Sequence, residues 1–149
     1  LLGHALLEKL ARPYKAITAS VLLVRADAPG TAAAVDAAAV SAAMGIPIVP
    51  DPFPDRNVFI RSDQYSFVRA GIPALFPKFG FAAGTPEAVL ERAWRANIYH
   101  SPRDDVNQPV LRAEALKFNA WSAALLRKVA DNPEAPRWRN TSHFARYAK

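Results

Sequence analysis

The feature that most constrains the fold is the alternation of short apolar segments with helix-forming segments. Residues 17–25 are rich in Ile, Val and Leu and predict a buried strand, and residues 46–49 predict a second, shorter one. Between them, the alanine-rich residues 31–44 predict a helix with Thr31 as its N-cap and Gly45 just after its end. Strands that alternate with helices imply an α/β sandwich.

The second half of the chain continues this pattern. Residues 74–79 predict a strand, residues 65–70 a short helix, and residues 111–131 a long amphipathic helix. A further helix is expected to begin at Thr85, the cap, and Pro86, the first helical residue, and to end near residue 97. The remaining expectations are a helix at residues 2–15, a turn at 27–30, a strand-like segment at 58–60 and a loop at 80–84.

Composition fits one domain that spans residues 1–149, with residues 132–149 as a C-terminal tail whose Trp138 and Phe144 pack back on the body. The chain has no cysteine, so any metal site must use His, Asp or Glu. No apolar run approaches the roughly 20 residues of a membrane span. The net charge of +6 is concentrated near the C-terminus and is typical of a solvated basic tail.

A polar segment at residues 98–106 contains the histidine best placed for chemistry. His100 follows a phenol, Tyr99, and precedes the carboxylate of Asp104, which either orients the segment or caps the turn. Pro102 keeps His100 out of a helix interior, so we expect the imidazole at a helix end or in a loop, facing a cleft.

One histidine cannot hold zinc alone, because a catalytic zinc takes about three protein ligands. The other two histidines, His4 and His143, lie near the termini and are weaker candidates. Because no other histidine lies near it in the sequence, His100 is also compatible with a purely structural role.

A second polar group, residues 61–64, lies between apolar runs. Ser62 or Asp63 is expected to cap the helix that follows. Arg61 is expected to point into the same cleft as His100, as a fixed cation for a carbonyl, a carboxylate or developing negative charge. The chain contains no Gly-x-Ser-x-Gly, no Gly-rich phosphate loop and no His-Glu-x-x-His.

Four motifs occur in a fixed order: Pro-Asp-Pro at 50–52, Ile-Arg-Ser-Asp-Gln-Tyr-Ser-Phe at 60–67, Gly-Ile-Pro-Ala-Leu at 71–75 and Tyr-His-Ser-Pro-Arg-Asp-Asp at 99–105. Together they resemble the C-terminal half of the co-catalytic di-zinc exopeptidases, family twenty-eight of the metallopeptidases. The resemblance runs from about residue 36 to residue 144, and residues 1–30 match poorly. It implies a partial three-layer α/β/α sandwich of the zinc-exopeptidase type with a mixed sheet.

The resemblance also implies roles for individual residues. His100 corresponds to the last zinc ligand, Tyr99 to a tyrosine that hydrogen-bonds the tetrahedral intermediate, and Arg61 to an arginine that assists there. Three further side chains are expected to shape the site rather than bind metal: Ser62, Asp63 and Asp104. The implied protein is a two-zinc aminopeptidase that hydrolyses N-terminal peptide bonds, in the periplasm or secreted.

The family's other ligands do not occur in this sequence. They are a His-x-Asp segment, a Glu-Glu pair that contains the general base, and an Asn-x-Asp segment. The chain therefore offers at most one partial zinc site, which leaves it uncertain whether this chain is itself an enzyme.

Three interpretations follow. The favoured one is the C-terminal portion of a zinc aminopeptidase, inactive alone. The alternatives are a pseudo-enzyme or binding module with a remnant of this fold, and a protein that binds anionic polymers through its basic tail. In the favoured case the partner is a peptide substrate, an exposed sheet edge favours self-association, and neither nucleic acid nor membrane is a partner.

Overall fold

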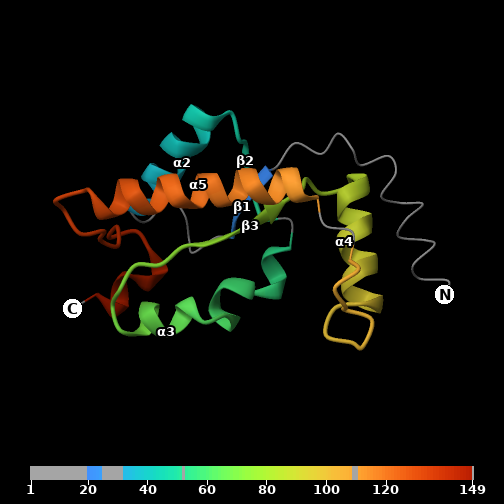
Figure 1. The fold of residues 1–149 in the computed structure, drawn as a ribbon. Helices are drawn as coiled ribbons and strands as arrows, with labels where there is room; N and C mark the ends of the chain where they lie inside the picture. The colour runs from blue at the N-terminus through green and yellow to red at the C-terminus, as the bar shows by residue number, and fades with distance from the viewer. Residues whose placement is uncertain (1–19, 25–31, 52, 109–110, 149) are drawn as a thin grey trace.

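The computed structural model describes residues 20–24, 32–51, 53–108 and 111–148 (Figure 1). Its elements are β1 (Ser20–Val24), α2 (Ala32–Met44), β2 (Ile48–Val49), the 3₁₀ helices η2 (Pro54–Arg56) and η3 (Val58–Arg61), α3 (Gln64–Arg69), β3 (Phe76–Gly80), α4 (Pro86–Asn97), α5 (Arg112–Ala130) and the 3₁₀ helix η4 (His143–Tyr147). The helix predicted at residues 2–15 and the turn predicted at 27–30 lie outside the described residues. Among the described helices, none has both the length and the apolar character needed to cross a bilayer.

The sheet is small and mixed, in the order β2-β1-β3. The central strand β1 pairs in parallel with β2, where Val21 lies opposite Ile48, and antiparallel with β3, where Leu22 lies opposite Lys78. Parallel neighbours require a crossover connection, and α2 lies in the connection between β1 and β2.

The predicted three-layer α/β/α sandwich of the zinc-exopeptidase type is wrong. The described residues form a sheet of three short strands, of five, two and five residues, and most of the regular structure is helical. A ladder this small lacks the continuous surface that helical layers on both faces would need. The apolar side chains collect instead in two separate clusters.

The first cluster joins α2 to α5, which run side by side in Figure 1. Its buried members are Ala37, Val40, Ile46, Trp121 and Leu125. Helical spacing of three and four residues places Ala37 with Val40, and Trp121 with Leu125, on the facing sides of the two helices, and Ile46 joins them from the segment after α2. Phe118 extends the cluster to the sheet, because its ring lies 4.7 Å from that of Phe79 on β3.

The second cluster joins η3, α3 and the C-terminal tail. Its buried members are Phe59, Val68, Trp138 and Phe144. The ring centroid of Phe144 lies 5.4 Å from that of Phe59 and 5.6 Å from that of Trp138. The prediction that Trp138 and Phe144 pack back on the body is confirmed.

Helix boundaries agree closely with the sequence, but the capping contact expected of Thr85 is not made, and the predicted cap Thr31 lies outside the described residues. α2 ends at Met44, and Gly45 takes a φ of 64°, which a residue without Cβ adopts at little cost. Thr85 lies at the N-cap of α4 and Pro86 at its first position, as predicted. The Thr85 hydroxyl, however, donates to the Ala82 carbonyl at 2.8 Å and makes no capping bond.

The strand-like segment predicted at residues 58–60 is wrong, because these residues form the 3₁₀ helix η3. Asn57 precedes it with a φ of 49°, a left-handed conformation that turns the chain between η2 and η3. Asparagine tolerates this conformation better than most residues. The turn overrides the strand propensity of Val58 and Ile60.

Candidate functional site

The aromatic pair Tyr99–His100 lies just after α4. Ile98 is buried and its backbone N–H donates to the Trp94 carbonyl at 2.8 Å, so the helix end is anchored. The next residues turn away, and His100 takes a φ of 56°. The two rings then stack, with centroids 3.7 Å apart and planes inclined by 22°. The structure thus presents an exposed imidazole against a partly exposed phenol, at a helix end as expected.

Ser101, rather than Asp104, stabilises the turn that follows. Its hydroxyl donates to the Ile98 carbonyl and accepts from the Arg103 N–H at 3.2 Å. Within the described part of the chain, the exposed Asp104 carboxylate has no hydrogen bond or ion pair. Only the Asp104 backbone N–H contributes, by donating to the Ser101 carbonyl at 3.0 Å.

The second predicted group lies at the junction of η3 and α3. The Ser62 hydroxyl donates back to the Val58 carbonyl at 3.0 Å, and Asp63 occupies the N-cap position without a side-chain capping bond. The predicted capping role is therefore wrong. Asp63 has a φ of −57° and a ψ of −35°, already helical, whereas a capping side chain needs an extended backbone to reach the helix N–H groups.

The cation beside Tyr99 comes from α4. The guanidinium carbon of Arg95 lies 5.0 Å from the centroid of the Tyr99 ring, within cation–π range. In the described residues, no hydrogen bond, ion pair or ring contact joins Arg61 to Tyr99 or His100. Arg95 lies in the last turn of α4 and Tyr99 just beyond its end, so their closeness in the chain was the available sequence signal.

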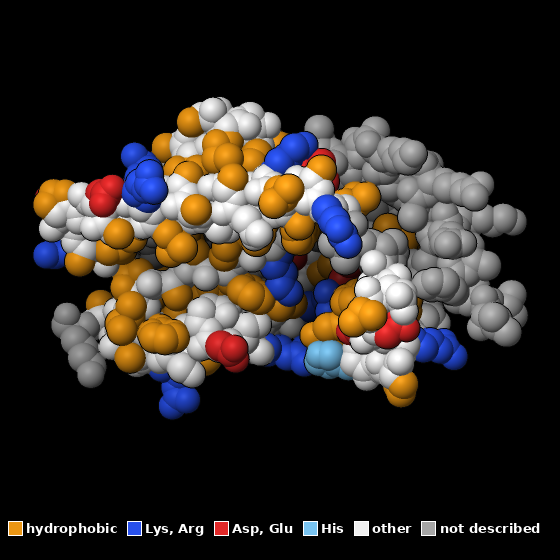
Figure 2. All heavy atoms as spheres, in the orientation of Figure 1, with side chains coloured by type: hydrophobic (Ala, Val, Ile, Leu, Met, Phe, Trp, Pro, Cys, Tyr) orange, Lys and Arg blue, Asp and Glu red, His pale blue; other side chains and the backbone are white. Residues whose placement is uncertain are grey.

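A charge cluster extends from Arg95 toward the sheet. The Glu91 carboxylate accepts from Arg95 on its own helix and from Arg56 of η2 at 3.3 Å. Burial lowers the pKa of the Lys78 amine on β3, the charge of Arg95 lowers it further, and Glu91 opposes the shift. Figure 2 shows Lys and Arg side chains gathered in the hollow between α3 and α4.

This cluster has an excess of positive charge, because Arg56 and Arg95 both pair with the single carboxylate of Glu91 and Lys78 lies within electrostatic range of it. Such an arrangement attracts carboxylates and other anions. Sequence reasoning missed it because its members come from η2, β3 and α4. Arg56 and Glu91, for example, are 35 residues apart in the chain.

The described residues do not form a zinc site. No group of three His, Cys, Asp or Glu side chains in this part of the chain lies close enough to hold a metal ion. His100 supplies one nitrogen, and a catalytic zinc needs about three protein ligands. Zinc would therefore require ligands from elsewhere.

Comparison with known proteins gives one match. No curated protein and no solved structure matches this chain. The sequence model of Peptidase family M28 matches residues 12–125, well over half of the 149 residues. The matched segment contains the whole three-stranded sheet, the charge cluster and the Tyr99–His100 pair, and it ends before the C-terminal tail. The chain therefore belongs to Peptidase family M28.

Proposed function

We propose that this chain supplies the C-terminal part of the catalytic domain of a zinc-dependent aminopeptidase and is inactive alone. Family membership supports a peptidase-related function. The aminopeptidase activity, the zinc and the incompleteness are our inferences from the four ordered motifs and from the family ligands that the sequence lacks.

The stacked Tyr99–His100 pair is the observation that carries the proposal. The imidazole is exposed, and its only described contact is the ring of Tyr99, so its nitrogens are available to a metal. Neutral imidazole is the commonest metal ligand among side chains. We assign His100 as one zinc ligand of the completed site.

Tyr99 and its neighbouring cation are the groups that would act on a peptide carbonyl. The phenol can donate a hydrogen bond to the oxygen on which negative charge develops, an effect worth about 3 kcal/mol in comparable sites. Arg95, 5.0 Å from the ring, would add positive charge at the same place. Arg61 remains the alternative arginine for this role.

Complementation tests the proposal. The chain is mixed with a polypeptide that carries the family's His-x-Asp, Glu-Glu and Asn-x-Asp segments, and the zinc content and hydrolysis of aminoacyl substrates are measured. Neither component alone is expected to hydrolyse substrate. The mixture is expected to bind zinc tightly and to release N-terminal residues.

The critical variant is His100→Asn, because asparagine tolerates the left-handed backbone that alanine would strain. His100→Asn should lower the zinc content of the mixture, whereas His143→Asn, at the other histidine that the structure describes, should not. Equal zinc content and equal hydrolysis in the parent and His100→Asn would refute the assignment of His100.

One observation favours a second candidate, a non-catalytic peptide-binding module. The described residues contain no metal-binding cluster and yet retain an aromatic and cationic surface around Tyr99. Peptide binding by the complemented protein without zinc or hydrolysis would support this candidate over the aminopeptidase.

A further inference from the structure

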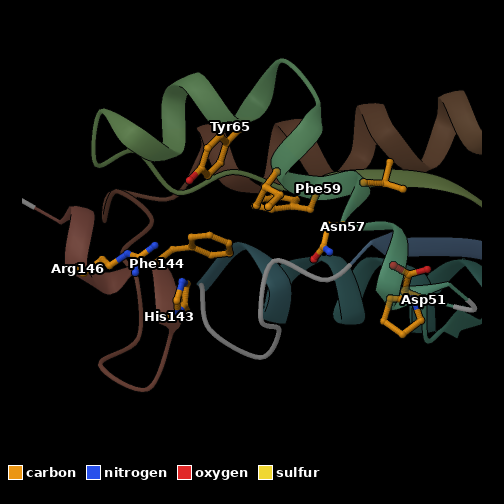
Figure 3. Close-up of a pocket in the computed structure, with 10 residues that line it drawn as sticks. Asp51, Asn57, Phe59, Tyr65, His143, Phe144 and Arg146 are labelled. Atoms are coloured by element: carbon orange, nitrogen blue, oxygen red, sulfur yellow. The ribbon is translucent and has the colours of Figure 1, made fainter.

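A cavity of about 330 Å³ lies between the η2–η3 turn and η4 (Figure 3). Three aromatic side chains line it: Phe59, Tyr65 and Phe144. Two of them, Phe59 and Phe144, are members of the buried tail cluster, so the wall they form is fixed by packing. The volume and the mixture of apolar walls with a few polar groups are typical of small-ligand sites.

The cationic end of the cavity is formed by η4. Figure 3 shows His143 and Arg146 together on one side, next to Phe144. The Nη2 atom of Arg146 donates to the Tyr147 hydroxyl at 3.3 Å, and no carboxylate in the described residues lies within ion-pair distance of it. In the part of the chain that the structure describes, the His143 side chain makes a single contact, edge-to-face with the Phe144 ring. These donors are therefore available to an anionic group.

The opposite end of the cavity carries an acid. Asp51 lies there in Figure 3, with Asn57 and Phe59 between it and Arg146. One carboxylate oxygen of Asp51 accepts from the Phe53 N–H at 2.8 Å, which fixes the group, and no described cation forms an ion pair with it. The other oxygen can accept from a ligand.

Asn57 forms part of the wall between the two ends. Its left-handed φ of 49°, at the turn between η2 and η3, places the residue in this wall. Its amide nitrogen donates to the Asp55 carbonyl at 3.2 Å, so its side-chain oxygen remains available to a ligand N–H.

We propose that this cavity binds a short peptide of about two or three apolar residues with both termini free. The terminal ammonium would pair with Asp51 and the terminal carboxylate with Arg146 and His143, while a side chain packs on Phe59 and Phe144. A single amino acid carries both charges on one carbon, whereas Asp51 and Arg146 lie at opposite ends of the cavity in Figure 3. A dipeptide or tripeptide separates them by extended residues of about 3.5 Å each.

This site is separate from Tyr99 and His100, neither of which lines the cavity. His143, Phe144 and Arg146 also lie beyond the segment that matches the family, which ends at residue 125. Peptide binding here consequently does not depend on the proposed aminopeptidase function, and either can fail without the other.

Titration of the full chain with leucyl-phenylalanine, its N-acetyl form and its C-terminal amide tests the proposal. Binding is followed by calorimetry or by NMR shifts. Each blocked peptide should bind about tenfold more weakly than the free one, because each loses one charge-assisted hydrogen bond. Equal affinities for the three peptides, or no saturable binding at millimolar concentration, would overturn it.

Two variants identify which end binds which group. Asp51→Asn should abolish the preference for the peptide with a free amine over the acetylated peptide. Arg146→Gln should abolish the preference for the peptide acid over the peptide amide. The matched controls Asp55→Asn and Arg139→Gln change exposed residues outside the cavity and should leave both preferences intact. Thermal unfolding establishes that each variant is folded, and the blocked peptides test the parent protein independently of any variant.

Discussion

The indole nitrogen of Trp121 donates a 2.7 Å hydrogen bond to the hydroxyl oxygen of Ser41, and both side chains are buried. The bond joins residues 80 positions apart and fixes how α5 lies against α2. A buried donor without a partner is costly, so this bond sets the relative register of the two helices more strictly than the surrounding apolar contacts do.

Ser41→Ala should lower the free energy of unfolding by about 1–3 kcal/mol, because the indole N–H would remain buried without an acceptor. Urea denaturation measures the change. Ser66→Ala, at an exposed position in α3, is the matched control and should change stability little. If the two variants were equally stable, the hydrogen bond would contribute nothing to the α2–α5 contact.

Phe144→Ala should destabilise the chain by about 3–5 kcal/mol, the usual cost of removing a buried aromatic side chain. Phe144 contacts the rings of Phe59, Tyr65 and Trp138, so its loss opens a void in the tail cluster. Phe67→Ala removes a ring that is 57% exposed and serves as the control. A similar loss of stability in both variants would mean that the tail does not stabilise the body.

The Lys78 amine should react with an amine-selective reagent at lower pH than an ordinary lysine does, because burial and Arg95 lower its pKa. Labelling over a pH series, read by mass spectrometry, gives the Lys78 midpoint in the parent and in each variant. Arg95→Gln should move the Lys78 midpoint upward and Glu91→Gln should move it downward. Identical midpoints in the parent and Arg95→Gln would contradict the proximity of the two cations.

The same shift gives Lys78 a defined effect on stability. With its folded pKa below the ordinary 10.5, the unfolded chain binds more protons at this residue between the two values. Lys78 therefore destabilises the folded state at pH values below its folded pKa, and this penalty is relieved as the pH rises through that interval.

The phenols of Tyr65 and Tyr147, whose oxygens are 3.2 Å apart, should titrate separately. Their hydrogen bond raises the pKa of Tyr65 and lowers that of Tyr147, where Arg146 adds a second bond. Ultraviolet titration should show Tyr147 ionising first. Tyr65→Phe should raise the pKa of Tyr147, whereas Tyr99→Phe should leave it unchanged. A Tyr147 pKa that Tyr65→Phe did not alter would exclude the bond.

The sequence was sufficient to predict the longer helices, because the spacing of apolar residues and the residues that begin and end a helix are local signals. α5 begins one residue after the predicted start at 111 and ends one residue before the predicted end at 131. Strands β2 and β3 fall at the predicted places with shifted ends. The strand predicted at 58–60 failed because the left-handed Asn57 directs the chain into a 3₁₀ helix, and propensity does not register such a turn.

The site was only partly predictable for a related reason. The position of His100 after a helix followed from Pro102 and was found as expected. The contact between Arg56 and Glu91, and the cavity formed by Asp51 and Arg146, depend on how distant segments pack. Pairings at such separations leave no periodic trace in a single sequence.

The left-handed backbone at His100 has a consequence for how any complete site would be assembled. The imidazole of His100 and the phenol of Tyr99 are stacked on one short turn that is anchored by Ile98. Any movement of this turn would therefore carry both rings together and preserve their mutual orientation. A complementary polypeptide would then need only to dock against a preassembled pair. Residues 94–101 could accordingly be transplanted as one cassette into another helix end that permits the same turn.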